Sequence, residues 1–329
     1  MPGPTSLNIS VVIPVYNAAK FIERGVRSAL LFEEVKEVIL VEDASPDNSL
    51  EVCKALAESL PRVRLYQHPG GVNQGAAASR NLGIAQSTQE YIAFLDADDF
   101  FLPNRFDAER GIFRDHPDAD GVYGSLGAHY YDDEGRALYD SLFQEVFTVR
   151  KRVGPEELFE GLSGVIPDFG QFHLDALTVK RIALMGMDRL MRKEIHLHED
   201  TDFIIRLAWY ARLYPGSIDA PVAIRGVHRE NRITRNDRVA HTELVLYRLL
   251  WEWAKATGVS AAARERFHYK YRLNEMRTMR NGMRATGLAL RHRRYLERFD
   301  FREAYIRALA GEDTRFSRLL RNVGWRLYN

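Results

Sequence analysis

The chain has 329 residues, of which 46% are hydrophobic and 28% are charged, and its formal net charge is +1. This composition is typical of a globular protein and excludes the collagen-like, low-complexity and disordered classes. No apolar run reaches the length of a membrane-spanning helix, and the N-terminus lacks the pattern of a secretory signal. The single cysteine, Cys53, cannot form an internal disulfide, so we expect a cytoplasmic protein with this thiol in its core.

The small net charge hides a difference between two parts of the chain. Residues 241–329 hold 19 Lys and Arg against 9 Asp and Glu, a net charge of +10. Residues 1–240 hold 27 against 36, a net charge of −9. An acidic body followed by a basic tail indicates two functional units, and the acidic body argues against a nucleic-acid partner.

The first third of the chain alternates short apolar runs with segments of helical periodicity. Strands are expected at Ile9–Ile13, Val38–Val41, Val63–Tyr66 and Tyr91–Leu95, and helices at Ala18–Leu31, from Asp47 or Asn48 to Leu60, and at Gly75–Ala85. This alternation predicts a parallel sheet with helices on both faces. Ligands of such sheets bind outside the carboxyl ends of the strands, where the polar segments of this chain lie.

The rest of the chain is expected to contain fewer regular elements before it becomes helical. The pattern predicts a helix at Asn104–His116, short strands within Gly121–Tyr131, a polar insertion or mobile lid over 132–168, a loop at Met187–His198, an amphipathic helix at Asp200–Arg212, and Arg-rich helices from about Asn236. No internal repeat is found.

Three carboxylates follow the fourth expected strand. Asp96, Asp98 and Asp99 repel one another when they are placed together, and a divalent cation such as Mg²⁺ or Mn²⁺ removes that cost. Residues two apart in a strand point the same way, so Asp96 and Asp98 are expected to face one ligand. The alternative is a solvated turn in which Asp99 caps the next helix.

Two further polar segments follow strands. Glu42 and Asp43 end the second strand, where a carboxylate is placed to accept hydrogen bonds from a ribose hydroxyl or a base N–H. Residues 73–83 are rich in small side chains that allow close approach to a ligand, and Arg80 is a candidate partner for a phosphate or carboxylate. The alternatives are a helix cap for the first segment and a helix packed closely on the sheet for the second.

Four segments of the chain, Val11–Asn17, Val41–Ser45, Asn73–Gly83 and Phe94–Asp99, resemble the motifs of family 2 glycosyltransferases in their order and spacing. The resemblance is close over 8–110 and looser through His198–Asp200 and Arg225–Arg235. It implies an α/β protein with the GT-A fold, a mixed and mostly parallel sheet with flanking helices. Residues 1–235 would form this domain, with a nucleotide-binding part at 8–110 and an acceptor or catalytic part at 111–235, and 236–329 would be a basic helical C-terminal extension.

The resemblance also implies roles for individual residues. The donor nucleotide and sugar would contact Pro14, Tyr16, Asn17, Glu42, Asp43, Asn73, Gly75, Arg80, Asp96 and Ala97. The family usually has Asp-Asp where this chain has Glu42-Asp43, so Asp43 is carried over more firmly. Asp98 would be the direct ligand of Mn²⁺ or Mg²⁺, with Asp96 and His228 as further ligands, and Asp200 would be the catalytic base. Arg229, Arg232 and Arg235 would contact the diphosphate.

The implied activity is inverting transfer of a sugar from a nucleoside-diphosphate sugar, with UDP favoured, to a hydroxyl of a saccharide or lipid-linked acceptor. Cell-surface polysaccharide or glycolipid synthesis is the expected setting. The Arg-rich segments 291–294 and 315–328 suggest peripheral contact with the anionic inner face of a membrane, or a homodimer contact.

Three alternatives stay open. The chain could be a non-catalytic relative or partner subunit, although Asp43, Asp96, Asp98 and Asp200 are all retained. A sugar nucleotidyltransferase would need a glycine-rich basic loop after the first strand, and a dehydrogenase would need Gly-x-Gly-x-x-Gly there. The sequence at that position is Pro-Val-Tyr-Asn, which has neither pattern.

Overall fold

The computed structural model describes residues 7–140, 147–228, 231 and 239–278. The chain divides into two compact units, Met1–Arg235 and Asn236–Asn329, and each is described by itself. The first unit contains two sheets, and the second contains a pair of helices in its described part.

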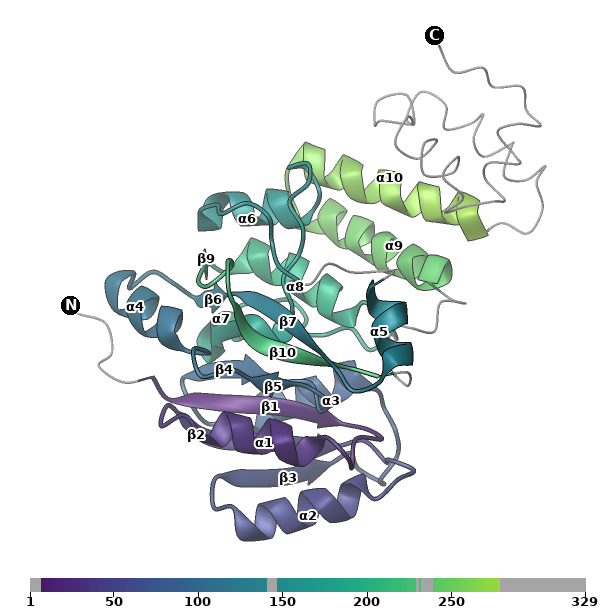
Figure 1. The fold of residues 1–329 in the computed structure, drawn as a ribbon. Helices are drawn as coiled ribbons and strands as arrows, with labels where there is room; N and C mark the ends of the chain where they lie inside the picture. The colour runs from purple at the N-terminus through teal and green to yellow at the C-terminus, as the bar shows by residue number, and fades with distance from the viewer. Residues whose placement is uncertain (1–6, 141–146, 229–230, 232–238, 279–329) are drawn as a thin grey trace. The chain divides into compact units, whose positions relative to one another are not determined.

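The larger sheet is mixed and mostly parallel. Its strands lie in the order β3 (Val63–Gln67), β2 (Val35–Glu42), β1 (Ile9–Val15), β4 (Tyr91–Phe94), β8 (Leu177–Lys180), β6 (Gly121–Tyr123) and β9 (Leu213–Pro215). Strand β8 runs antiparallel to both of its neighbours, and the other pairs are parallel. Because β1, β2 and β4 are parallel, their carboxyl ends meet at one edge of the sheet (Figure 1).

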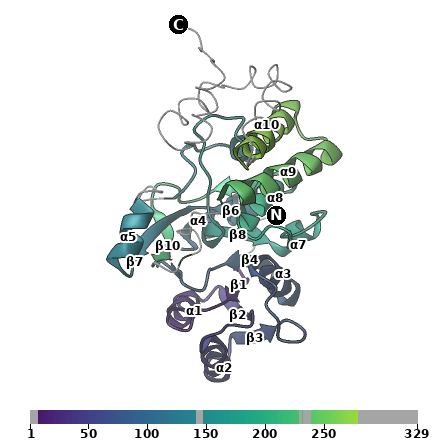
Figure 2. The ribbon, with the colours of Figure 1, turned by 90° about the vertical axis from the view of Figure 1, so that its right-hand side faces the viewer.

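Helices cover both faces of this sheet. The described helices of the first unit are α1 (Ile22–Leu30), α2 (Ser49–Ser59), α3 (Ala76–Gln86), α4 (Asp107–Asp115), α5 (Asp133–Asp140), α6 (Pro155–Leu162), α7 (Arg181–Met185), α8 (Glu199–Tyr210) and the 3₁₀ turn η1 (Leu174–Ala176). Figure 2 shows α1 and α2 on one face of the β1–β2–β3 region and α3 on the other.

The packing of β1 explains this arrangement. Val11 and Ile13 point into the core cluster that also holds Val26 of α1 and Cys53 of α2. Val12 points the other way, toward α3, where Gly83 lies so close that an added Cβ would overlap the Val12 side chain. The strand is apolar on both faces because both faces are covered. Cys53 is fully buried, which confirms its expected place in the core.

A smaller sheet carries one wall of the site described below. Its strands lie in the order β5 (Phe100–Phe101), β10 (Pro221–Val227) and β7 (Ser125–Tyr130). Strand β10 is antiparallel to β5 and parallel to β7. Residues near the end of the first unit therefore lie beside β5, the segment that directly follows Asp96–Asp99.

Several expected elements differ from the structure. The first strand continues through Pro14 to Val15, and the expected helix at Ala18–Leu31 begins only at Ile22. The segment 132–168, expected as an insertion or lid, contains α5 and α6, and α6 is anchored by the buried side chains of Leu158 and Phe159. The antiparallel strand β8 was not predicted, because its short apolar run has no signal for strand direction.

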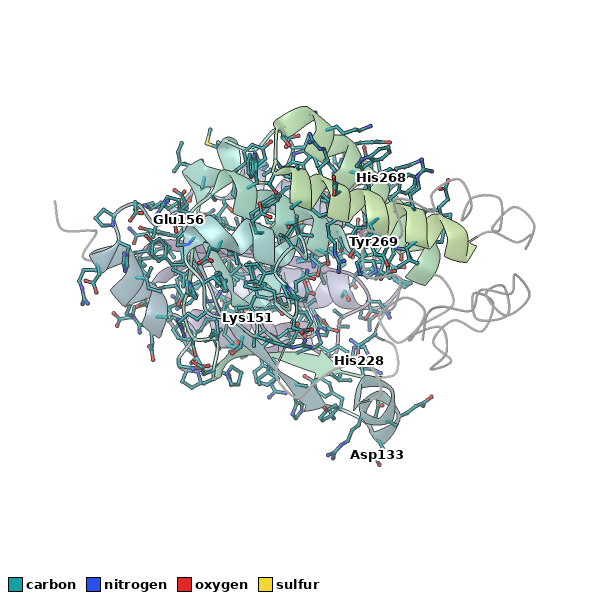
Figure 3. All side chains as sticks on the ribbon, turned by 90° about the horizontal axis from the view of Figure 1, so that it is seen from above. Asp133, Lys151, Glu156, His228, His268 and Tyr269 are labelled. Atoms are coloured by element: carbon teal, nitrogen blue, oxygen red, sulfur yellow. The ribbon has the colours of Figure 1, made fainter. Side chains whose placement is uncertain are left out.

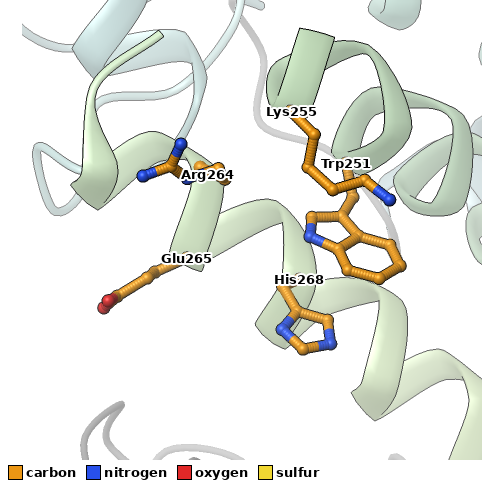
Figure 4. Close-up of a pocket in the computed structure, with 5 residues that line it drawn as sticks. All are labelled: Trp251, Lys255, Arg264, Glu265 and His268. Carbon is orange, nitrogen blue, oxygen red and sulfur yellow. The ribbon is translucent and has the colours of Figure 1, made fainter. Parts of the chain in front are cut away.

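The second unit contains α9 (Val239–Thr257) and α10 (Ala261–Thr278), which pack against each other. The Trp251 indole stacks on His268 with ring centroids 4.4 Å apart, and Lys255 Nζ lies 4.0 Å from the Trp251 ring (Figure 4). These side chains line a cavity of about 330 Å³ with Arg264 and Glu265. None of the described helices combines the length and apolar character needed to cross a bilayer. The segments 291–294 and 315–328 lie outside the described residues.

Candidate active site

The carboxyl ends of β1 and β2 form the first part of the site, and hydrogen bonds join the loops that follow them. The Asn17 N–H donates to Ser45 Oγ at 3.1 Å, and the Ala18 N–H donates to Ser49 Oγ at 2.9 Å. Asn17 has φ +54°, a left-handed conformation that Asn tolerates better than most residues. Tyr16 is 54% exposed beside this turn. The loops thus present an exposed aromatic ring on a fixed backbone.

Asp43 holds the start of α3 against this edge of the sheet. Its carboxylate accepts hydrogen bonds from the main-chain N–H groups of Gln74 at 2.7 Å and Gly75 at 2.8 Å. Its carbonyl oxygen accepts one from Asn73 Nδ2 at 2.8 Å. Gly75 has φ +85°, a conformation that L side chains rarely adopt. The Asn73–Gly75 segment therefore adopts a conformation in which its donor groups reach Asp43.

Glu42 has a different environment from Asp43. Its side chain is buried and accepts hydrogen bonds from the N–H groups of Ala44 and Ser45 and from Gln67 Nε2. Both carboxylate oxygens thus have partners within the chain. Glu42 shapes the turn after β2, whereas Asp43 holds the start of α3.

Arg80 connects two parts of the chain that are far apart in sequence. The guanidinium is buried and donates to Asp96 Oδ1 at 2.6 Å and to Glu199 Oε1 at 3.1 Å. The next residue, Asn81, exchanges two hydrogen bonds with the main chain of Met191, at 2.8 and 3.0 Å. Helix α3 therefore fixes the end of β4 and the start of α8 relative to each other. Arg80 is a buried link rather than the open phosphate partner that its sequence position suggested.

Strand β4 ends at Phe94, so the strand alternation on which the common orientation of Asp96 and Asp98 was predicted does not extend to them. Asp96 pairs with Arg80, whereas Asp98 Oδ2 lies 3.2 Å from His228 Nε2 and accepts a hydrogen bond from Asn231 Nδ2 at 2.8 Å. His228 follows the end of β10 and is labelled in Figure 3. The two carboxylates thus belong to two different clusters.

His228 is held on three sides. Its ring stacks on Phe21, with centroids 4.8 Å apart and planes at 21°. Its main-chain N–H donates to Asn231 Oδ1 at 2.6 Å, so the Asn231 amide contacts both Asp98 and His228. Nothing in the sequence distinguished Asn231 or Phe21, because both sit in segments where their residue types are common.

Asp200 is the second residue of α8 and is partly exposed. Its Oδ1 accepts a hydrogen bond from the Thr201 N–H at 2.7 Å, and its Oδ2 lies 3.9 Å from His173 Nε2. Burial raises the pKa of Asp200, but the groups around its carboxylate, Arg80 and the Thr201 N–H among them, outweigh this effect and hold the pKa below its usual value. The carboxylate is therefore ionised at neutral pH.

The start of α8 is fixed by a buried ion-pair cluster. Asp202 is fully buried and pairs with Arg192 at 2.9 Å and with Arg206 at 2.7 Å. Arg206 also donates to the carbonyl of Leu190 at 2.6 Å. These bonds hold the loop before α8, which sequence reasoning described only as a loop.

Comparison with known proteins decides the family. Residues 10–177, about half of the chain, match the model of glycosyl transferase family 2. The chain is 37% identical over 201 residues to an uncharacterized glycosyltransferase of Haemophilus influenzae. The aligned region covers 60% of this chain and 70% of that protein. This chain belongs to glycosyltransferase family 2. It is also 38% identical over 105 residues to the succinoglycan biosynthesis protein ExoU of Rhizobium meliloti, covering 32% of this chain and only 30% of ExoU.

Solved structures confirm the expected GT-A fold for this family 2 glycosyltransferase. Residues 1–349 of Staphylococcus aureus TarS, in complex with UDP-GlcNAc, superpose with a TM-score of 0.60 at 18% identity, covering 83% of this chain and 74% of that one. The mannosyltransferase PcManGT of Pyrobaculum calidifontis, in complex with GDP-Man and Mn²⁺, gives 0.53 at 19% identity and covers 95% and 89%.

Two clusters in this glycosyltransferase offer ligands of the kind that divalent cations prefer. Asp96, His173 and Asp175 place one ligand atom each within 4.8 Å of one another. However, Asp96 already pairs with Arg80, and Asp175 Oδ1 accepts a hydrogen bond from the Asp96 N–H at 3.0 Å. Within the described residues, no Lys or Arg pairs with Asp98, the carboxylate of the second cluster. Asp98 and His228 are therefore candidate ligands of a divalent cation, in addition to the first cluster.

Two acids near these clusters share a buried contact. Asp99 accepts a hydrogen bond from the Gly226 N–H at 2.8 Å and lies beside Asp175. Burial raises the pKa of Asp99 well above its usual value, and the neighbouring carboxylates of Asp175 and Asp98 add to the effect. Asp99 is thus a buried structural acid rather than a cap of the next helix. Arg229, Arg232 and Arg235 lie outside the described residues.

Proposed function

We propose that this protein transfers a sugar from a nucleoside-diphosphate sugar to an acceptor hydroxyl with inversion of configuration. The observation that carries the proposal is the double contact of Arg80, which fixes Asp96 on the donor side against Glu199, the residue before Asp200. A donor site and a candidate base are thereby held in one rigid frame. Preorganisation of this kind is what a single-base displacement needs.

The donor nucleotide would bind at the carboxyl ends of β1 and β2. Tyr16 offers an exposed ring for the base, and Pro14 and Asn17 complete the turn beside it. Asp43, Asn73 and Gly75 would approach the base and ribose from the start of α3. UDP-sugars are the favoured donors because the TarS structure holds UDP-GlcNAc, while GDP-sugars are the second choice because PcManGT holds GDP-Man.

Asp98 and His228 would hold Mn²⁺ or Mg²⁺, which would supply positive charge to the donor diphosphate. Asn231 would orient both ligands through its amide. Asp96 and Ala97 would lie beside the donor sugar. Arg229, Arg232 and Arg235 are proposed to add positive charge near the diphosphate.

Asp200 would act as the base. Its Oδ1 is occupied by the Thr201 N–H, so Oδ2 is the oxygen available to the acceptor. As the acceptor oxygen bonds to the anomeric carbon, its proton passes to Asp200 Oδ2 and the bond between that carbon and the diphosphate breaks on the opposite face. The nucleoside diphosphate leaves with the electron pair, and Asp200 becomes a neutral acid until the proton is lost to solvent.

The acceptor is proposed to be a saccharide or a lipid-linked saccharide in polysaccharide synthesis at the inner face of the membrane. Support comes from the similarity to ExoU, which is named for succinoglycan biosynthesis. A non-catalytic nucleotide-sugar-binding subunit is the alternative.

A donor screen tests this proposal. Purified protein is incubated with Mn²⁺ and UDP-, GDP- or dTDP-sugars, and donor hydrolysis and thermal stabilisation are recorded. Asp200→Asn should lower transfer and hydrolysis by more than about 100-fold while it keeps nucleotide affinity within about threefold. Stabilisation without any hydrolysis by the wild-type protein would favour the non-catalytic alternative.

A further inference from the structure

One histidine that the sequence left without a role lies at the centre of the site. His173 directly precedes the 3₁₀ turn η1 and is buried, with 4% of its surface exposed. Its Nε2 is 3.9 Å from Asp96 Oδ2 and also 3.9 Å from Asp200 Oδ2. A single imidazole nitrogen thus faces a donor-side carboxylate and the proposed base at equal distances.

The other ring nitrogen decides which way His173 is protonated. The main-chain N–H of Asp175 donates to His173 Nδ1 at 3.3 Å, and this bond caps η1. The Asp175 Oδ2 atom also lies 3.4 Å from Nδ1. A neutral imidazole carries one N–H, so an Nδ1 that accepts this capping bond leaves the proton on Nε2, whereas a proton on Nδ1 would face Asp175 Oδ2 instead. With the capping bond in place, the donor N–H of His173 is the one that faces Asp96 and Asp200.

The ring has little freedom to turn away from these carboxylates. The Asp175 carbonyl accepts a hydrogen bond from Arg105 Nε at 2.9 Å, and Arg105 is fully buried. The Phe147 ring meets the imidazole edge-on with centroids 6.4 Å apart. The Asp175 backbone, which donates to His173, is thus fixed, and so is one side of the imidazole ring.

We propose that His173 is the positioning residue of Asp200, donating its Nε2–H to Asp200 Oδ2 when the acceptor is bound. This inference rests on the proposed function. Thr201 N–H holds only Oδ1, so the Asp200 carboxylate needs a second contact to fix the plane in which Oδ2 meets the acceptor hydroxyl. Catalytic hydrogen bonds are often longer before substrate binds, and a movement of less than about 1 Å brings 3.9 Å into range.

Two variants of different chemistry test this role. His173→Gln replaces the imidazole by an amide that can still donate and accept hydrogen bonds on a side chain of similar length. His173→Leu keeps only the side-chain volume. We expect His173→Leu to lower kcat by about 10- to 100-fold, with KM for the donor within about threefold and Mn²⁺ affinity unchanged. His173→Gln should recover most of the lost kcat.

The competing reading is that His173 ligates a cation together with Asp96 and Asp175. Mn²⁺ affinity, measured by electron paramagnetic resonance without donor or acceptor, separates the two. A fall of more than about tenfold in His173→Leu would overturn positioning in favour of ligation. An unchanged kcat in His173→Leu would also overturn the proposal that His173 positions Asp200.

A readout without turnover keeps this test separate from that of the proposed function. ¹⁵N-histidine NMR of the ligand-free protein should show His173 protonated at Nε2, with a resonance that moves in Asp200→Asn and in Asp96→Asn. A protonated Nδ1, or a resonance indifferent to Asp200→Asn, would refute the contact even if the wild-type protein turned over no donor.

Discussion

The main chain of Gly226 lies directly against the carbonyl group of Asp98, so closely that a Cβ at position 226 would overlap that carbonyl oxygen. The same glycine donates its N–H to Asp99 Oδ1 at 2.8 Å. At Gly226, strand β10 thus contacts the Asp98 loop through its own main chain. The only side chain that fits there is the hydrogen of glycine.

Gly226→Ala should therefore push the Asp98 loop away from β10. We expect a loss of about 1–3 kcal/mol in the free energy of unfolding and weaker Mn²⁺ binding, because Asp98 would move relative to His228. Denaturant unfolding and electron paramagnetic resonance measure the two effects. Gly111→Ala is the matched control, since a Cβ there meets no atom within 4 Å, and it should be neutral or stabilising. Equal behaviour of the two variants would contradict the close approach.

Asn231→Ala removes the amide that joins Asp98 to the backbone of His228. We expect about a 10- to 100-fold loss of Mn²⁺ affinity, the usual effect of removing a group that orients a metal ligand. Isothermal titration with Mn²⁺ measures it. Asn73→Ala, which removes an amide on the nucleotide side, serves as the control and should leave Mn²⁺ affinity unchanged. A normal affinity in Asn231→Ala would show that Asp98 and His228 need no such support.

Arg80→Leu leaves Asp96 and buried Glu199 without their common cation. Breaking a buried ion pair in this way costs about 3–5 kcal/mol, so a marked fall in melting temperature is expected. Arg80→Leu combined with Glu199→Leu and Asp96→Asn should recover part of this loss, because the two carboxylate charges that Arg80 balanced are also removed. Calorimetry on the three-fold variant checks this, and no recovery would show that Arg80 contributes through packing.

Cys53 offers a direct probe of the core. Burial raises the pKa of its thiol to about 12, with the charges of Glu42 and Asp47 adding to the shift. At pH 8 the thiol is therefore fully protonated and shielded, and a disulfide reagent should react with it only after unfolding. Reaction in native buffer at the rate of a free thiol would contradict its burial. Because Cys53 is the single cysteine of the chain, the reaction reports on one site.

The sequence predicted the donor half of the fold well. Strands β1 to β4 and helices α1 to α3 carry strong periodic signals, and the polar residues at their ends follow from strand direction. The prediction from sequence failed where the direction and pairing of a strand depend on partners that are distant in the chain. Strand β8 is antiparallel because it lies between β4 and β6, and no property of its four residues encodes that.

The site shows the same division. Motifs predicted Asp43, Asp98 and Asp200 as site residues, but they did not predict the side chains that contact these carboxylates. His173 and Asn231 reach these carboxylates from other elements through single side-chain contacts. A lone histidine or asparagine in a polar segment has no periodicity or spacing to mark it. The separation of Asp96 from Asp98 also depends on where β4 ends, a boundary that apolar patterning places only approximately.

Asp98 and His228 are 130 positions apart in the chain, yet their side chains are 3.2 Å apart. In the unfolded chain, bringing two such residues together carries a large loop-closure entropy cost, so a cation has little affinity for the pair before folding. A cation that binds them in the native state therefore shifts the folding equilibrium by mass action. The supply of such a cation would then raise the folded fraction of this protein and lengthen its lifetime against proteolysis.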